Sequence, residues 1–231
     1  MRSTRLIPLL AATVAIVACG SDNTGTNPGT GNGTGNEPKV VYNLALAAGV
    51  VDSATATVAT PIPVIVHLTQ AGAVVSGATV RWTISQGSGK VSADSTTTDA
   101  NGDASVQWTL GDTVGVNTVS ATALGAAVAY HATGVAGAAA NLVRVSIDSS
   151  AVVAGASLPL FVRAVDGLGN GTGGTDITWS ATGGLVTFTT TTTGTKGGAS
   201  TVFTPPSTPG TYTVTATLPG KATVSFKIVA L

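Results

Sequence analysis

The sequence predicts an all-β protein built from two tandem β-sandwich domains. Thr, Val, Ala and Gly dominate the composition, which favours strands and turns over helices. Residues 98–110, TDANGDASVQWTL, return in altered form at residues 193–205 as TGTKGGASTVFTP. A period of about 95 residues is far too long for a solenoid repeat and matches one small β-sandwich. The chain is therefore read as a tandem array of two such units.

Size, charge and cysteine content limit what the chain can be. With 231 residues, of which 43% are hydrophobic, it has enough apolar material for two cores. Ten basic residues balance ten acidic ones, so charge gives no case for a nucleic-acid partner or for binding to anionic lipid. The chain has a single cysteine, which excludes an internal disulfide. The domains must therefore be held together by packing alone.

Residues 1–18 are predicted to be a signal peptide. Arg2 and Arg5 precede an apolar run of about 13 residues, which is too short to span a bilayer stably. The tetrapeptide IVAC at residues 16–19 resembles the lipobox of bacterial lipoproteins, in which the signal is cut before the cysteine and the cysteine is acylated. The resemblance implies that Cys19 is lipidated and binds the protein to a membrane. An ordinary secretory signal with an incidental cysteine is the alternative.

Residues 19–39 are predicted to form a disordered tether. After the cysteine the segment is rich in Gly, Thr and Asn and has almost no apolar side chain to bury. Such a composition does not offset the entropy of ordering, so a flexible linker is expected. Its average reach is about 25 Å, which would hold the domains off the membrane surface.

The first domain is predicted over residues 40–136. Apolar and polar residues alternate with period two at 79–84, 104–110 and 118–123, as they do in strands with one face on a core. Trp82 and Trp108 are in phase with the apolar residues of their strands, so both are assigned to the core. About seven strands are expected in this domain.

Asn101 and Gly102, preceded by Asp99, predict a tight turn between two of these strands. Asp99, Asn101 and Asp103 also resemble the front half of a calcium loop, but no bidentate Glu follows at the required distance. The second copy has other residues at these positions: Gly194, Lys196 and Gly198. The shared feature is the turn, so the three residues are only weak metal candidates and no cofactor is expected.

A family resemblance rests on residues 71–91, AGAVVSGATVRWTISQGSGKV, on TDANGDA at 98–104 and on the later Gly115. Together they resemble the bacterial immunoglobulin-like domains of the invasin and intimin type. The resemblance implies two tandem immunoglobulin-like β-sandwich domains, after a signal peptide and flexible linker, that serve as rigid spacers in a surface protein. The D-x-x-G-N turn common in that family is absent at residues 70–72.

The second domain is predicted over residues 137–231, with residues 137–140 as the hinge. Here a D-x-x-G-N turn is present, and Gly169 and Asn170 are its turn residues. The pattern of its strands places three aromatic residues in the core: Trp179, Phe203 and Phe226. Nothing in this chain corresponds to the membrane barrel or lectin-like tip of invasins and intimins, so receptor binding of their kind is not carried over.

The lack of recognisable catalytic motifs in the sequence predicts that the chain is not an enzyme. His67 and His131 are expected on solvated strand faces, and no metalloprotease, nucleophile-elbow or paired-carboxylate pattern occurs. The expected function is a lipid-anchored cell-envelope protein, at the outer membrane or cell surface rather than the inner membrane. There its domains would act as a structural or adhesive spacer that contacts an unidentified surface protein or glycan. The alternative is a carbohydrate- or small-ligand-binding lipoprotein of the periplasm or cell surface.

Overall fold

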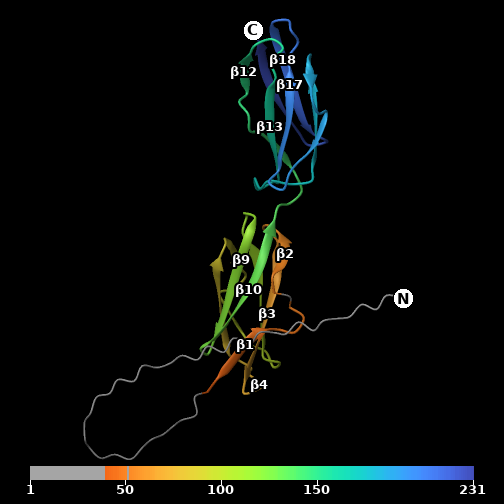
Figure 1. Cartoon of the computed structure of the whole chain (residues 1–231). Coiled ribbons are helices and arrows are strands. Elements are labelled where there is room, and N and C mark those ends of the chain that lie inside the picture. The colour runs from red at the N-terminus through yellow and green to blue at the C-terminus, as the bar shows by residue number, and fades with distance from the viewer. Residues whose placement is uncertain (1–39, 51) are drawn as a thin grey trace, which may run out of the picture. The chain divides into compact units, whose positions relative to one another are not determined.

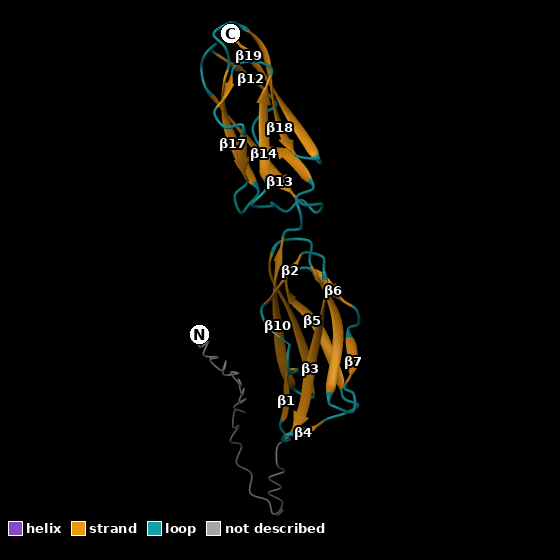
Figure 2. Cartoon of the chain, turned by 90° about the vertical axis from the view of Figure 1, so that its right-hand side faces the viewer, coloured by secondary structure: helices purple, strands orange, loops and turns teal. Residues whose placement is uncertain are grey.

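The computed structural model describes residues 40–50 and 52–231, apart from the side chain of residue 149. Within this range every regular element is a β-strand, so the all-β class is confirmed (Figure 2). Contacts group Val40–Leu231 into one compact unit. Cys19, the predicted signal peptide at 1–18 and the predicted tether at 19–39 lie outside the described residues.

The first sandwich has ten strands in two sheets (Figure 1). One sheet has the order β1-β3-β8-β6, with β4 paired to β3, and the other has the order β2-β10-β9-β5-β7. All pairs are antiparallel except β2 with β10, which run parallel. The strands are β1 (Tyr42–Leu46), β2 (Ala54–Thr57), β3 (Pro61–Gln70), β4 (Ala73–Val74), β5 (Thr79–Gln86), β6 (Gly89–Val91), β7 (Ser95–Thr97), β8 (Asp103–Leu110), β9 (Gly115–Ala123) and β10 (Ala126–Val135).

The second sandwich repeats this topology. Its sheets have the orders β11-β13-β17-β15 and β12-β19-β18-β14-β16, and β12 again runs parallel to the last strand. Only β4 lacks a counterpart, since a single bridge between Val165 and Gly171 stands in its place. The strands are β11 (Asn141–Arg144), β12 (Ser149–Val152), β13 (Leu158–Val165), β14 (Asp176–Ala181), β15 (Leu185–Val186), β16 (Thr190–Thr192), β17 (Gly198–Thr204), β18 (Gly210–Leu218) and β19 (Ala222–Ala230).

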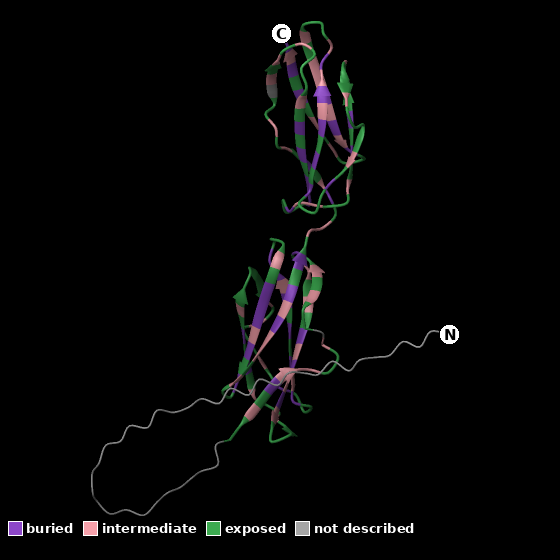
Figure 3. Cartoon of the chain, viewed as in Figure 1, coloured by how far each residue is buried: buried purple, intermediate pink, exposed green. Residues whose placement is uncertain are grey.

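Each sandwich encloses its own hydrophobic core, made by the inward face of alternating strand residues (Figure 3). All three tryptophans are buried: Trp82 is 4% exposed, Trp108 is 0% exposed and Trp179 is 3% exposed. In the second core Phe203 and Phe226 are also buried, and the Phe226 ring stacks on Trp179 at 6.4 Å between centroids. Such large side chains supply much of the apolar area that holds each sandwich together.

Two of the three buried indole N–H groups have a hydrogen-bond partner, and the third has none. Trp82 Nε1–H donates to Thr96 Oγ1 at 2.8 Å, and Trp179 Nε1–H donates to Thr191 Oγ1 at 2.8 Å. Trp108 Nε1 is buried without a hydrogen-bond partner. Phe203, which lies at the equivalent position of the repeat, has no such donor. A buried donor without a partner costs free energy, so the first core carries a penalty that the second avoids.

We therefore expect Trp108→Phe to change the free energy of unfolding by no more than about 1 kcal/mol, because loss of the unpaired donor offsets the lost apolar area. Trp82→Phe is the matched control and removes a satisfied hydrogen bond, at a cost of about 1–2 kcal/mol. Urea unfolding followed by circular dichroism measures both. If Trp108→Phe destabilises the chain as much as Trp82→Phe, the penalty does not exist.

The sequence echo corresponds to one hydrogen-bonded turn present twice. Gly102 N–H donates to Asp99 O at 3.0 Å, and Gly197 N–H donates to Gly194 O at 2.7 Å. Gly102 has φ 78° and Gly197 has φ 81°, and residues other than glycine rarely adopt a φ in this range. The carbonyl of each of these glycines then accepts an N–H from the preceding long strand, at Leu68 and at Ala164. What the two copies share is thus a backbone geometry.

Candidate functional site

The weak metal candidates are engaged in protein contacts. Asp99 Oδ1 accepts the backbone N–H groups of Asn101 at 2.8 Å and Asp103 at 2.9 Å, and these bonds lower the pKa of Asp99. Asp103 Oδ1 lies 2.7 Å from His67 Nδ1. Calcium needs six to eight oxygen ligands, and two of the candidate oxygens, Asp99 Oδ1 and Asp103 Oδ1, already have partners in the protein. No cluster of three or more His, Cys, Asp or Glu that could hold a metal ion occurs among the described residues.

Both histidines pair with a carboxylate on the surface of the first sandwich. His67 contacts Asp103, and His131 donates its backbone N–H to Asp52 at 2.8 Å while its Nδ1 lies 3.1 Å from the same oxygen. A catalytic triad also needs a nucleophile in hydrogen-bond reach of the imidazole. No side-chain hydroxyl or thiol is hydrogen-bonded to either ring in the described part of the chain. The lack of enzyme activity stays a prediction.

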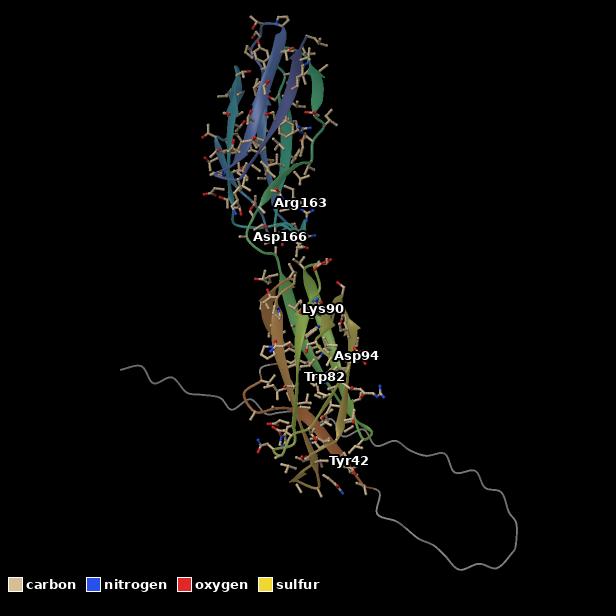
Figure 4. The ribbon with its side chains drawn as sticks, turned by 180° about the vertical axis from the view of Figure 1, so that it is seen from behind. Tyr42, Trp82, Lys90, Asp94, Arg163 and Asp166 are labelled. Carbon is tan, nitrogen blue, oxygen red and sulfur yellow. The ribbon has the colours of Figure 1, made fainter. Side chains whose placement is uncertain are left out.

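A hollow of about 350 Å³ lies between β5 and β6, lined in part by Trp82, Lys90 and Asp94, which Figure 4 labels. Carbohydrate-binding modules present aromatic rings as stacking surfaces. Here the Trp82 ring is almost wholly buried and its N–H is held by Thr96. The hollow therefore offers the ligand-binding alternative no aromatic platform.

The most highly organised polar group of the described chain is the turn after β13. We call residues 166–170 the Asp166 corner. Asp166 Oδ1 accepts the backbone N–H groups of Leu168 at 2.9 Å and Asn170 at 2.8 Å, while Asp166 N–H donates to Asn170 O at 2.8 Å. Gly169 has φ 89°, which closes the turn. Asp166 is 3% exposed and Asn170 is 8% exposed, so both polar side chains are buried, and both are hydrogen-bonded.

The second carboxylate oxygen of Asp166 holds the linker. Gly137 N–H donates to Asp166 Oδ2 at 2.9 Å. Three residues further on, Ala140 N–H donates to Val165 O at 2.8 Å, and between them Lys221 Nζ donates to Ala139 O at 2.6 Å. Ala139 is itself part of the second core. The predicted hinge at residues 137–140 is thus hydrogen-bonded along its length to the second sandwich.

Asn170 links the Asp166 corner to the first sandwich. Its Nδ2–H donates to Asp112 O at 2.7 Å, and its Oδ1 accepts the N–H of Val114 at 3.2 Å. A primary amide has both a donor and an acceptor, so one side chain satisfies two backbone groups of the same loop. That loop connects β8 to β9 in the first sandwich. The Asp166 corner, the linker and residues 112–114 together form what we call the joint.

The electrostatics of the joint favour an ionised Asp166. Burial by itself would raise the pKa of this carboxyl, but hydrogen bonds from Gly137, Asn170 and Leu168 outweigh it and lower the pKa. Arg163 lies nearby on β13, as Figure 4 shows, and donates through Nε to Lys196 O at 2.9 Å. Because N–H donors surround the Asp166 carboxylate, it is a backbone clamp and not a cation ligand.

Sequence reasoning identified part of the joint. Gly169 and Asn170 were predicted as turn residues, and they lie in this turn, but the contact of Asn170 with the first sandwich was missed. The roles of Asp166, Gly137, Lys221 and residues 112–114 were also missed. One signal was available, because Asp99 and Asp103 have the same spacing as Asp166 and Asn170, with a glycine one residue before the last position. Both segments form the same aspartate-capped turn.

No protein-family model matches the sequence, and no curated protein matches it. Among solved structures, the chain is similar to FdeC, an adhesin of Escherichia coli, with a TM-score of 0.53 and 22% identity over 82% of this chain and 63% of that one. It is also similar to the D0-D1 domain of intimin (TM-score 0.35, 22% identity, 83% of this chain and 100% of that one). A third similar structure is invasin, a bacterial integrin-binding protein, with a TM-score of 0.39 and 24% identity over 83% of this chain and 40% of that one. Together with the repeated sheet order, the FdeC likeness confirms the predicted tandem immunoglobulin-like fold.

Proposed function

We propose that this chain is a lipid-anchored cell-envelope protein whose two immunoglobulin-like sandwiches act as a structural or adhesive spacer on the cell surface. The joint is the observation that carries the proposal. A spacer keeps a set distance only if its domains do not swing freely, and adjacent domains move relative to one another by default unless contacts prevent it. Asn170 supplies such contacts from a buried position.

The joint combines several bonds that are individually modest. A hydrogen bond contributes about 1 kcal/mol to stability, and bonds to a charged group contribute more. Asp166 holds the linker, Lys221 holds its middle and Asn170 holds the preceding loop. The three side chains act on neighbouring stretches of backbone, residues 112–114 and the linker at 137–140, so their hydrogen bonds restrain the same connection. That property suits a joint that must stay in one arrangement.

The adhesive part of the proposal is supported by the fold and by the printed description of a similar protein. FdeC is an adhesin. We propose that loops of this chain contact a surface protein or glycan. The outer membrane or the cell surface is the proposed location.

The anchor is supported by the sequence of residues 16–19. In the described part of the chain, no helix combines the length and the apolar character needed to cross a bilayer. Each buried methylene of an acyl chain contributes about 0.8 kcal/mol, and two or more chains on one residue bind a membrane stably. We propose that Cys19 carries such chains.

We expect Cys19→Ser to move the protein from the membrane fraction to the soluble fraction, because serine does not carry the thioether-linked lipid. Fractionation of cells followed by immunoblotting measures this. Ser21→Ala is the matched control, since it changes a neighbouring residue of the same segment and should leave the protein in the membrane fraction. Membrane retention of Cys19→Ser would remove the lipid anchor from the proposed function.

A further inference from the structure

The joint connects one end of the first sandwich to the opposite end of the second. Because the two sandwiches share a topology, each of these ends has an equivalent in the other sandwich that lies outside the joint. We call the end where the first strand of a sandwich begins its proximal end, and the end where the last strand finishes its distal end. The Asp166 corner is proximal in the second sandwich, because Asn141 at the start of β11 pairs with Val165 at the end of β13. Residues 112–114 are distal in the first sandwich, beside the pair of Gly115 with Gly134.

The proximal end of the first sandwich lacks the Asp166 corner. Gln70, the last residue of β3, occupies the place that Asp166 has in the second sandwich, because His67 pairs with Asp103 as Arg163 pairs with Gly198. From there Ala71 and Gly72, at φ 49° and 85°, make a two-residue turn directly into β4. This turn is a tight hairpin connection and provides neither a capping carboxylate nor an amide equivalent to that of Asn170.

The distal end of the second sandwich lacks the other half of the joint. Gly210 starts β18 and pairs with Ala230, as Gly115 starts β9 and pairs with Gly134. One residue before these glycines lie Val114 in the first sandwich and Pro209 in the second. Val114 N–H donates to Asn170 Oδ1, but proline has no N–H to donate. The equivalent loop, residues 205–209, therefore cannot receive an asparagine in the same way.

We infer that the joint is directional: the distal end of the first sandwich and the proximal end of the second recognise each other, and the opposite end of each sandwich does not reproduce the contacts. The partner of residues 112–114 is thus the second sandwich, and a second copy of the chain does not extend the array from head to tail. The inference deepens the proposed spacer function by naming the contacts that set its joint, and it does not depend on the lipid anchor.

The test measures the distance between the two sandwiches in the full chain. In the Cys19→Ser background, Thr122→Cys and Thr223→Cys place one nitroxide label on an exposed strand position of each sandwich. Double electron–electron resonance then reports the distance distribution. Asn170→Ala removes the amide. Val114→Pro places in the joint the residue found at the equivalent position of the second sandwich, and Pro209→Val makes the reverse exchange at that position.

We expect one narrow distance distribution for the parent chain and for Pro209→Val, and a broad one for Asn170→Ala and Val114→Pro. Circular dichroism melting identifies a variant that fails to fold, and if Val114→Pro does so, Asn170→Ala decides alone. A narrow, unchanged distribution in Asn170→Ala would overturn the inference. So would head-to-tail oligomers of the parent chain in analytical ultracentrifugation, where a monomer is expected. Failure of the anchor would instead be seen only in the fractionation of Cys19→Ser.

Discussion

Asp166→Asn should destabilise the second sandwich by about 2–3 kcal/mol. The carboxylate accepts the N–H groups of Gly137, Leu168 and Asn170, and an amide in its place has only one acceptor oxygen and turns an N–H₂ group toward donors. At least one buried donor is then left without a partner. Amide hydrogen exchange measures the effect for each sandwich separately, and the loss of protection should be concentrated in β13, β14 and β17.

The same residue should make the stability of the second sandwich depend on pH. Hydrogen bonds outweigh burial and place the folded pKa of Asp166 below its ordinary value of 3.8. A group with a lowered folded pKa stabilises the fold above the unfolded pKa, and this contribution is lost as the pH falls through the folded pKa. Protection of the second sandwich should therefore fall between about pH 5 and pH 2, and by less in Asp166→Asn.

Asp99→Asn is the matched control for both measurements. Asp99 caps an equivalent turn with the same two backbone bonds, and its pKa is also lowered, but it lies in the first sandwich and contacts no linker. Its replacement should act on the first sandwich alone. If Asp166→Asn leaves both the protection and the acid sensitivity of the second sandwich unchanged, Asp166 is not the clamp described above.

Gly197→Ala should destabilise the chain by about 3 kcal/mol. Gly197 has φ 81°, and an added Cβ would collide with the backbone oxygen of Ala164 and approach Gly171 Cα to 2.9 Å. Both neighbours are backbone atoms, Ala164 in β13 and Gly171 in the bridge to Val165, so neither can move aside without breaking strand pairing. The free energy of unfolding in urea measures the cost.

Two further substitutions serve as comparisons for Gly197→Ala: one in the same turn and one at the equivalent position of the first sandwich. Gly194→Ala changes a glycine of the same turn. Its new Cβ would lie 4.0 Å from Gly198 O, and its φ is not positive, so the change should cost less than about 1 kcal/mol. Gly102→Ala is the equivalent change in the first sandwich, where the Cβ would lie 2.8 Å from Leu68 O, and it should be costly as well. Equal destabilisation by Gly194→Ala and Gly197→Ala would contradict the claim that the two repeats share a turn that requires glycine at one position.

The sequence predicts the strands and the fold because their signals are local. The alternation around Trp82 and Trp179 follows from one face of a strand packing on a core, which needs no knowledge of the partner strand. The echo of residues 98–110 at 193–205 likewise marks a turn whose hydrogen bonds close within five residues. Such features are visible as soon as two copies are compared.

The joint could not be predicted in the same way, because its contacts connect distant segments. Asn170 meets residues 112–114 only after both sandwiches have formed, and Asp166 meets Gly137 across the whole of β11 to β13. A turn aspartate that caps only its own loop, as Asp99 does, has the same local sequence pattern as one that also holds a linker. The unpaired Trp108 N–H could not be predicted for a similar reason. The alternation of apolar and polar residues places the ring in the core but does not show whether its nitrogen has a hydrogen-bond partner.

A single measurement shows directly whether Asp166 and Asn170 hold the two sandwiches in one arrangement. Residual dipolar couplings of backbone amides, measured on the full Cys19→Ser chain in a weakly aligning medium, report the orientation of each sandwich. If the joint holds, one alignment tensor fits the couplings of β1 to β10 and of β11 to β19 together. Two tensors of clearly different magnitude would show that the sandwiches move independently, and would contradict a joint held by Asp166 and Asn170.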